Sequence, residues 1–209
     1  MDEHLETGDP PKRKRGRPRD PGANRRILDA ARAVAGEVGV HGASMSAIAD
    51  RSGVGKPTIY LRWANRREVM VAAIADLRAP VDTILTGRLR DDLTRALLDD
   101  REILVTGPDS RFLRSALFES ASDGEIAREL DESILAPRRE RVISILGRGI
   151  EEGQVRADVD VGSTADLLIA PLIRAMVLGG AGASTEDVER SADVVAGGIS
   201  SYVEAPGAG

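Results

Sequence analysis

The fold is decided by residues 44–68, which read SMSAIADRSGVGKPTIYLRWANRRE. Ala49, Gly53 and Ile59 have the sizes that two helices crossing at a tight turn require: a small residue at the crossing, a glycine at the turn and a branched apolar residue on the second helix. This pattern predicts a helix-turn-helix. In the docking geometry of that motif, the second helix enters the major groove of DNA and presents its N-terminal residues to the bases.

The same stretch contains the residues that start and stop its two helices. Ser44 can accept a hydrogen bond from a backbone N–H two or three residues on, so we expect it to cap a helix that runs to about Ser52. Gly53 can adopt the left-handed conformation that ends such a helix without steric cost. Pro57 falls in the first turn of the second helix, where a missing N–H is harmless.

A phosphate-binding loop is excluded, although residues 53–58 (GVGKPT) contain a Gly-Lys pair. That loop needs a glycine five residues before the pair and Ser or Thr directly after the lysine. Asp50 and Pro57 occupy these two positions. The segment is therefore interpreted as a turn and helix start, not as a nucleotide site.

A strongly basic segment, KRKRGRPR at residues 12–19, lies upstream of the motif. Its Gly and Pro prevent a helix, and a solvated tail is the simplest interpretation of an isolated charge run. Beside a helix-turn-helix, a flat extended arm can instead lie in a narrow A·T-rich minor groove, where negative potential is concentrated. The arginines expected to make these contacts are Arg13, Arg15, Arg17 and Arg19.

Charge is divided unevenly along the chain. Residues 11–78 contain 15 Lys and Arg against 6 Asp and Glu, a net charge of +9, whereas residues 79–209 contain 14 against 24, a net charge of −10. The whole chain carries −5 because residues 1–10 add −4. We expect one basic end to face DNA and the acidic remainder to disfavour binding in any other orientation.

Composition narrows the class of protein further. The 209 residues include no cysteine, which rules out disulfides and thiolate metal sites, and the two histidines, His4 and His41, lie too far apart to share a metal. No nucleophile has a base at a recognisable spacing, so an enzyme is disfavoured, and adjacent acid pairs such as Asp99-Asp100 are expected to be solvated. The N-terminus lacks a signal peptide, and the longest apolar run, residues 167–178, is too short to span a bilayer. We expect a cytoplasmic protein without metal or cofactor.

Helical periodicity extends over the rest of the chain, which predicts an all-α fold of about nine helices. A first helix ending near Gly39 has an apolar face, and a helix at residues 66–78, capped by Asn65, follows the motif. Beyond it we expect five helices, at about residues 84–104, 109–121, 124–152, 162–178 and 185–203. Ser184 and Asp187 form a capping pair at the last of these. The apolar face of the first helix comprises Ile27, Ala31, Val34, Ala35 and Val38.

The pattern A-x3-GV-x-K-x-T-I-Y, which runs from Ala49 to Tyr60, resembles the TetR/AcrR family of transcriptional regulators. The resemblance covers roughly residues 24–78 and differs from the commonest pattern at Trp63 and at residues 65–67. It implies an N-terminal three-helix DNA module followed by a helical effector-binding and dimerisation domain. The boundaries expected are a disordered arm at 1–22, the DNA-binding domain at 23–65, the second domain at 66–203 with 66–78 as the connecting helix, and a disordered tail at 204–209.

Individual roles on DNA follow from residue chemistry. Phosphate contacts, which fix register without reading sequence, are expected from Ser44, Ser46, Tyr60, Arg66 and Arg67. Base contacts are expected from Lys56, Pro57, Thr58 and Arg62. Trp63 is expected to pack in the core. One recognition helix reads few base pairs, so a homodimer on a palindromic operator is expected.

The resemblance implies that the last two helices form the dimer interface as a four-helix bundle. Residues assigned to that interface are Leu167, Ala175, Met176, Val188, Ala192, Val195, Ile199 and Tyr202. A small-molecule effector is expected among apolar residues with a few polar anchors. Residues assigned to the effector site are Phe112, Leu113, Leu117, Phe118, Glu119, Val142, Leu146, Leu168, Leu172 and Arg174. Arg174 is the candidate partner of an anionic effector or of Glu119.

The function expected from these features is that of a DNA-binding transcriptional regulator, a repressor released from its operator by the effector. Two alternatives remain. An architectural protein of low specificity would use the basic arm on A·T-rich DNA, but it would leave the acidic second domain unexplained. The second alternative is a transcriptional activator of the same fold.

Overall fold

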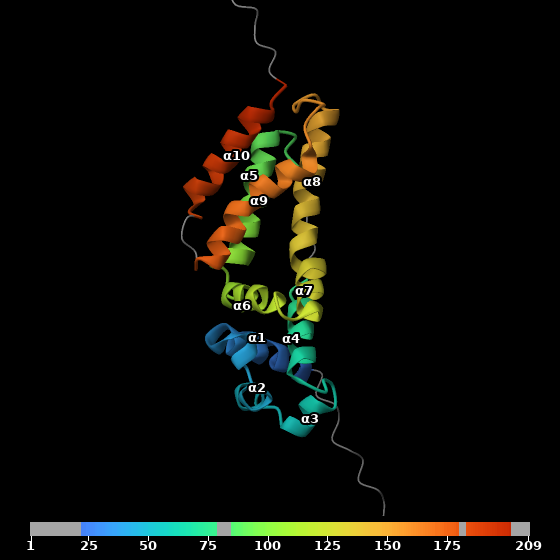
Figure 1. Ribbon diagram of the computed structural model, residues 1–209, viewed down its shortest axis with the longest axis vertical. Coiled ribbons are helices and arrows are strands. Elements are labelled where there is room, and N and C mark those ends of the chain that lie inside the picture. Colours follow the sequence, from blue (N-terminus) through green and yellow to red (C-terminus); the bar gives the residue numbers. More distant parts are fainter. Residues whose placement is uncertain (1–21, 79–84, 180–182, 202–209) are drawn as a thin grey trace, which may run out of the picture.

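The computed structural model describes residues 22–78, 85–179 and 183–201 (Figure 1). These residues are helical apart from turns, caps and an isolated bridge between Val155 and Ser200. Two π-helical segments, η1 and η2, extend neighbouring α-helices, so the helices form nine continuous segments within the described residues, as predicted. The elements are α1 (Ala23–Gly42), α2 (Met45–Ser52), α3 (Lys56–Tyr60), α4 (Arg66–Ala75), α5 (Leu89–Arg101), η1 (Glu102–Thr106), α6 (Ser110–Ser120), α7 (Gly124–Leu130), η2 (Asp131–Leu135), α8 (Ala136–Glu151), α9 (Val161–Val177) and α10 (Thr185–Ile199).

Helices α1 to α3, together with the expected connecting helix α4, which packs on α1, form the small module at one end of the molecule (Figure 1). Four of the five residues predicted for the inner face of α1 are buried, but Val38 is 58% exposed. Val38 lies in the last regular turn of α1 and points away from the core, whereas Val40, two residues on, is buried. At Gly39 the backbone leaves helical geometry with φ 82°, which only glycine adopts readily and which confirms the predicted stop.

Helices α5 to α10 form the second domain, in which α5, α8, α9 and α10 run along the long axis of the molecule (Figure 1). Helix α6 crosses beneath them and packs directly on α1. The predicted capping box is confirmed at α10, where Ser184 and Asp187 each satisfy a backbone N–H of the other. One hydrophobic core runs through both domains, so the module is not an appendage on a linker.

Candidate nucleic-acid interface

The helix-turn-helix is built as its sequence predicts. Ser44 caps α2, its Oγ accepting a hydrogen bond from the Ala47 N–H at 3.1 Å. Gly53 ends α2 with φ 66°, in the left-handed region. Pro57 lies in the first turn of α3, and Ile59 is fully buried beneath it. The short helix α3 is therefore held on the core by one side and leaves its other side open.

Six of the thirteen residues predicted to contact DNA lie on α2 and α3 or cap them. Ser44, Ser46, Lys56 and Pro57 are exposed at the starts of α2 and α3, and Tyr60 is 51% exposed. Thr58 is half-buried. Apart from Tyr60, which ends α3, these side chains lie at two helix N-termini, where backbone N–H groups also favour phosphate. The arrangement offers hydroxyl, ammonium and phenol groups on one polar surface.

The three arginines predicted for this surface have partners within the chain. Arg62 folds back on α3, its Nη1 donating to the Thr58 carbonyl at 3.1 Å. Arg66 donates to the His41 carbonyl. Arg67 Nε donates to Asp123 Oδ2 at 2.7 Å, so the predicted phosphate contact of Arg67 is revised: its guanidinium joins the module to the second domain.

The remaining residues singled out in the sequence either lie outside the described residues or have a structural role. Arg13, Arg15, Arg17 and Arg19 of the basic arm lie outside the described residues, as does the predicted tail at 204–209. Trp63 is half-buried and packs against the core, as predicted. Asn65 caps α4, its Oδ1 accepting from the Glu68 N–H at 3.0 Å, which the sequence also predicted.

The module and the second domain are joined by polar contacts that the sequence did not indicate. Arg32 of α1 reaches Asp76 at 2.7 Å and Asp109 at 3.2 Å, which connects the end of α4 to the start of α6. The Val40 N–H donates to Ser115 Oγ at 2.6 Å. At Asp123, burial acts to raise the pKa, but two backbone N–H groups of α7 and the Arg67 guanidinium outweigh it and lower the pKa.

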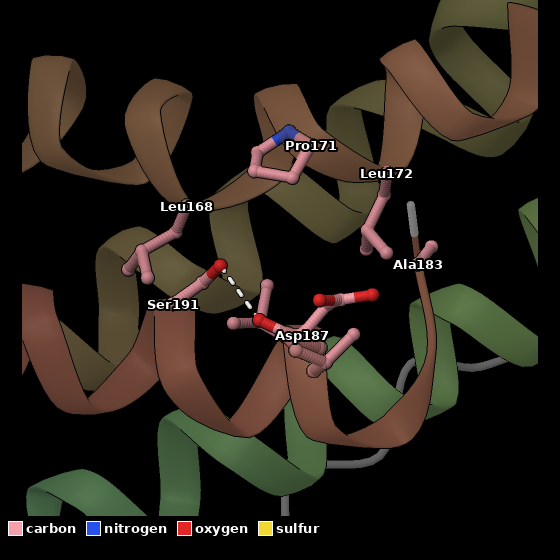
Figure 2. Close-up of a pocket in the computed structure, with 8 residues that line it drawn as sticks. Leu168, Pro171, Leu172, Ala183, Asp187 and Ser191 are labelled. Carbon is pink, nitrogen blue, oxygen red and sulfur yellow. Dashed lines mark hydrogen bonds between the residues drawn. The ribbon is translucent and has the colours of Figure 1, made fainter. Parts of the chain in front are cut away.

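Two cavities in the second domain bear on the effector prediction. A hollow of about 10 Å³ lies between α9 and α10, lined by Leu168, Pro171 and Leu172 on one side and Asp187 and Ser191 on the other (Figure 2). Ser191 Oγ donates to the Asp187 carbonyl at 2.9 Å, so this polar edge is satisfied internally. A groove of about 710 Å³ lies between α9 and the η2–α8 segment. The second is large enough for a small molecule and the first is not.

Most of the predicted effector residues do not line the groove. Phe112, Leu113, Val142 and Leu146 are buried core residues, and Leu168 and Leu172 line the small hollow. Leu117 is half-buried, Phe118 is 58% exposed, and Glu119 lies 3.8 Å from His41 rather than beside Arg174. None of these residues lines the groove: the six buried ones fill the core instead, and Leu117, Phe118 and Glu119 lie elsewhere on the surface of α6. Arg174 does line the groove.

The predicted dimer residues divide in a similar way. Ala175, Met176, Val188 and Ala192 are buried inside the chain, so they are corrected to core residues. Val195 and Ile199 are half-buried, Leu167 is 68% exposed, and Tyr202 lies outside the described residues. The exposed apolar residues of the same two helices are Leu167, Val177 and Val194, with Leu178 directly after α9.

A buried charge cluster is the main feature that was not predicted from the sequence. Asp99 is exposed as expected, but Asp100 is 2% exposed, so the prediction that it is solvated is wrong. Asp100 Oδ1 lies 2.7 Å from Arg141 Nη2 and 3.4 Å from Arg138 Nε. Burial raises the pKa of Asp100 to about 6 in spite of both arginines. The missed signal is spacing: Asp100 continues the apolar face of Leu93, Ala96 and Leu97.

The described residues limit other classes of site. No group of three or more His, Asp or Glu side chains among them is placed to hold a metal ion. None of their helices combines the length and apolarity that crossing a membrane requires. What remains is a polar helix-turn-helix surface at one end and a groove in the helical domain behind it. Together they define the class of DNA-binding regulators in which one chain carries both parts.

Comparison with known proteins agrees with this class. The family model described as "Bacterial regulatory proteins, tetR family" matches residues 27–73, and "Tetracyclin repressor-like, C-terminal domain" matches residues 83–195. The uncharacterized HTH-type transcriptional regulator YdeS of Bacillus subtilis is 30% identical over 171 residues, covering 80% of this chain and 84% of that protein. The chain therefore belongs to the TetR family of transcriptional regulators, which are not enzymes.

Solved structures share the fold. A putative TetR-family regulator from Rhodococcus sp. aligns with a TM-score of 0.70 at 17% identity, covering 85% of this chain and 98% of that one. The regulator FadR from Bacillus subtilis, solved in complex with stearoyl-CoA, aligns with a TM-score of 0.64 at 20% identity, covering 83% of this chain and 95% of that one. At such identities the likeness concerns the fold alone.

Proposed function

We propose that this DNA-binding regulator is a homodimeric repressor that binds a palindromic operator and is released from it by a small-molecule effector. The observation that carries the proposal is the polar surface of α2 and α3, which combines exposed Lys56 and Tyr60 with the exposed serines at the start of α2. Repression follows if the operator overlaps a promoter, since the bound dimer then blocks polymerase.

The polar surface suits a division of work between phosphate and base contacts. Ser44, Ser46 and Tyr60 carry hydroxyl groups at the edge of the surface, where they can donate to phosphates. Lys56, Pro57 and Thr58 occupy the start of α3, which is the part of a recognition helix that reaches base edges. Arg62 and Arg66 reach DNA after exchanging a backbone carbonyl for a phosphate, a stronger charge-assisted hydrogen bond.

Dimerisation is supported by the exposed apolar residues of α9 and α10. Leu167 and Val194 are 68% and 69% exposed, and Leu178 is 54% exposed. Large apolar side chains that gather on two neighbouring helices mark an interaction surface. A dimer that binds two half-sites on one face of the DNA needs its recognition helices about 34–36 Å apart, or a multiple of that distance.

Effector release is supported by the contacts between the domains and by a neighbour's ligand. FadR of Bacillus subtilis, which shares the fold, was solved with stearoyl-CoA in place. In this chain α6 packs on α1, and Arg67 pairs with Asp123 at the start of α7. An effector that binds better to a form with displaced modules must weaken DNA affinity by the same factor.

The experiment that tests the proposal is selection of bound DNA from a random pool, repeated over a salt series. A palindromic consensus and a steep loss of affinity with salt are expected. Lys56→Ala is expected to lower discrimination among bases by about 1–3 kcal/mol. Arg95→Ala is the control: Arg95 is an exposed residue of α5, and its replacement should change neither the affinity for DNA nor the discrimination among bases. Recovery of A·T-rich DNA without a palindrome would favour an architectural protein instead.

Transcription in vitro from the selected operator decides the direction of regulation. We expect the protein to reduce transcript yield when the operator overlaps the promoter. An increase in transcript would identify an activator of the same fold.

A further inference from the structure

The short helix α3 has an apolar outer side that the core does not use. Ile59 is fully buried and holds α3 on the module. At about 100° per residue, Pro57 and Leu61 each lie roughly 160° around the helix from Ile59. Leu61 directly follows α3 with helical backbone angles, and its N–H donates to the Pro57 carbonyl at 3.1 Å, so the two side chains lie one turn apart on the same side. The side of α3 that points away from the module is therefore formed by a proline and a leucine.

Leu61 has no packing role within the described part of the chain. Its 86% exposure is the highest of any large apolar side chain in residues 22–78, 85–179 and 183–201. It belongs neither to the core nor to the partly buried residues that pack against the core. Helix α3 lies at the end of the molecule opposite α10 (Figure 1), so the second domain does not cover it. An exposed leucine is ordinary on a protein surface; what distinguishes Leu61 is its place on the outer side of this helix.

Polar groups border the apolar pair on both sides. Lys56 and Tyr60, both exposed, lie on one flank of α3, and the half-buried Thr58 lies on the other. In the docking geometry of a helix-turn-helix, the second helix enters the major groove, where such polar groups meet phosphates and base edges. The apolar pair thus occupies the middle of the surface that is turned toward the bases.

The major groove offers one kind of apolar group to such a pair. Thymine presents its C5 methyl there, whereas the other three bases present hydrogen-bond donors and acceptors. Leucine and proline side chains have no polar atom with which to pair with those edges or with phosphate oxygens. Contact between Leu61 and a methyl group removes apolar surface from water, but contact with a polar edge desolvates that edge without replacing its hydrogen bond. Leu61 therefore favours thymine over the other bases.

We propose that Leu61, backed by Pro57, reads the C5 methyl of one thymine in each half-site of the operator. The inference rests on the proposed function, because it requires an operator that is bound in a defined register. It adds an apolar contact to the polar base contacts expected from Lys56 and Thr58, and it makes Leu61 a residue that determines specificity.

Replacement of thymine by deoxyuridine tests the contact, because it removes the methyl group and leaves the hydrogen-bonding groups of the base in place. Each thymine of the selected operator is replaced in turn, and the dissociation constant of the full chain is measured by fluorescence anisotropy at fixed salt. We expect one thymine per half-site at which replacement weakens binding about fourfold, and about fifteenfold when both half-sites are changed, as for a single methyl group lost from an apolar contact.

Variants assign the effect to Leu61. Leu61→Ala should bind the thymine operator more weakly, and its preference for thymine over deoxyuridine should fall from about fourfold to about twofold or less per half-site. Leu61→Met keeps the apolar bulk and should retain most of the preference, which keeps the test decisive if Leu61→Ala does not fold. Val38→Ala is the matched control, because Val38 is an exposed apolar residue of the same module on α1, and its replacement should leave the preference unchanged.

Three results would overturn the proposal. An equal loss of affinity for thymine and deoxyuridine DNA in Leu61→Ala would show that the leucine acts without touching a methyl group. An operator in which no thymine occurs at matching positions of the two half-sites would leave Leu61 nothing to read. If Leu61→Ala leaves both affinities unchanged and alters the sedimentation of the free protein, the leucine contacts another copy of the chain instead.

Failure of the methyl contact is distinguishable from failure of the proposed function. A random pool that yields no palindromic consensus refutes the sequence-specific repressor and the methyl contact with it. A palindromic operator that the wild-type protein binds equally well with thymine or with deoxyuridine at every position refutes the contact alone and leaves the proposed function standing.

Discussion

Replacing Asp100 by asparagine should change how stability depends on pH. Asp100 is buried with Arg138 and Arg141, and burial raises its pKa from 3.8 to about 6. Its pKa in the folded state is thus above that in the unfolded chain. Between about pH 4 and 6 the folded protein holds a proton that the unfolded chain has lost, so this residue's contribution to stability falls as pH rises.

The size of the effect follows from the shift. Between 3.8 and about 6 the pKa moves by about two units, and each unit corresponds to about 1.4 kcal/mol. Because the unfolded carboxyl is already partly ionised at pH 4, the free energy of unfolding of the wild type should fall by about 2 kcal/mol relative to Asp100→Asn between pH 4 and pH 7. The amide of asparagine resembles the protonated carboxyl and does not titrate, so the variant lacks this slope.

Urea denaturation at intervals between pH 4 and pH 7 measures the difference between the two proteins. Other carboxylates, such as Asp123 with its lowered pKa, act in the opposite direction, but they are common to both and cancel in the difference. Asp50→Asn is the matched control, because Asp50 is an exposed residue of α2 outside this charge cluster, so its replacement should leave the difference in slope unchanged. A difference between wild type and Asp100→Asn that stays constant with pH refutes the reasoning.

Three further predictions concern packing and caps, each measured as the free energy of unfolding in urea. Gly149→Ala should destabilise the protein by about 1–3 kcal/mol, because the new methyl group would lie 2.8 Å from Val155 Cγ2. Gly147→Ala is the control in the same helix: the space around Gly147 is open, so this change should stabilise the protein by about 0.5–1 kcal/mol. Equal effects of the two changes would contradict the close contact at Gly149. Ser44→Ala should cost about 1 kcal/mol through the lost cap of α2, so an unchanged stability would contradict that role. Ile59→Ala should lower the free energy of unfolding by about 2–5 kcal/mol, because Ile59 is fully buried. Leu61→Ala is the control: Leu61 is 86% exposed, so its replacement should change the free energy of unfolding by no more than about 0.5 kcal/mol. Similar losses at both positions would contradict the role of Ile59 in holding α3 on the core.

Features set by near neighbours in the chain were predictable from sequence. Ser44, Gly53 and Asn65 act at helix ends through hydrogen bonds or backbone angles within three residues, so their chemistry is local. The same is true of the capping box at Ser184 and Asp187. The helix-turn-helix and the order of the helices follow from such signals together with periodicity.

Features that depend on distant partners were not predictable in the same way. Arg67 has the composition of a phosphate contact, but Asp123, 56 residues later, takes its guanidinium. Ala192 and Val188 form an apolar stripe that suits a dimer interface as well as a core, and packing decides for the core. A single sequence states that a face is apolar without stating whether the same chain or another covers it.

The position of the groove gives the proposed switch a short physical route to DNA. Leu104, on the groove wall, belongs to η1, which is followed within four residues by the start of α6 at Ser110. Helix α6 packs on α1 so closely that a methyl group at Gly36 would lie 3.4 Å from Arg111 Cβ, and Ser115 holds the Val40 N–H at 2.6 Å. Because packed helices shift as rigid units rather than deform continuously, a ligand that displaces η1 must also displace α6 or strain the turn between them. Movement of α6 is then carried to α1, the helix on which α2 packs.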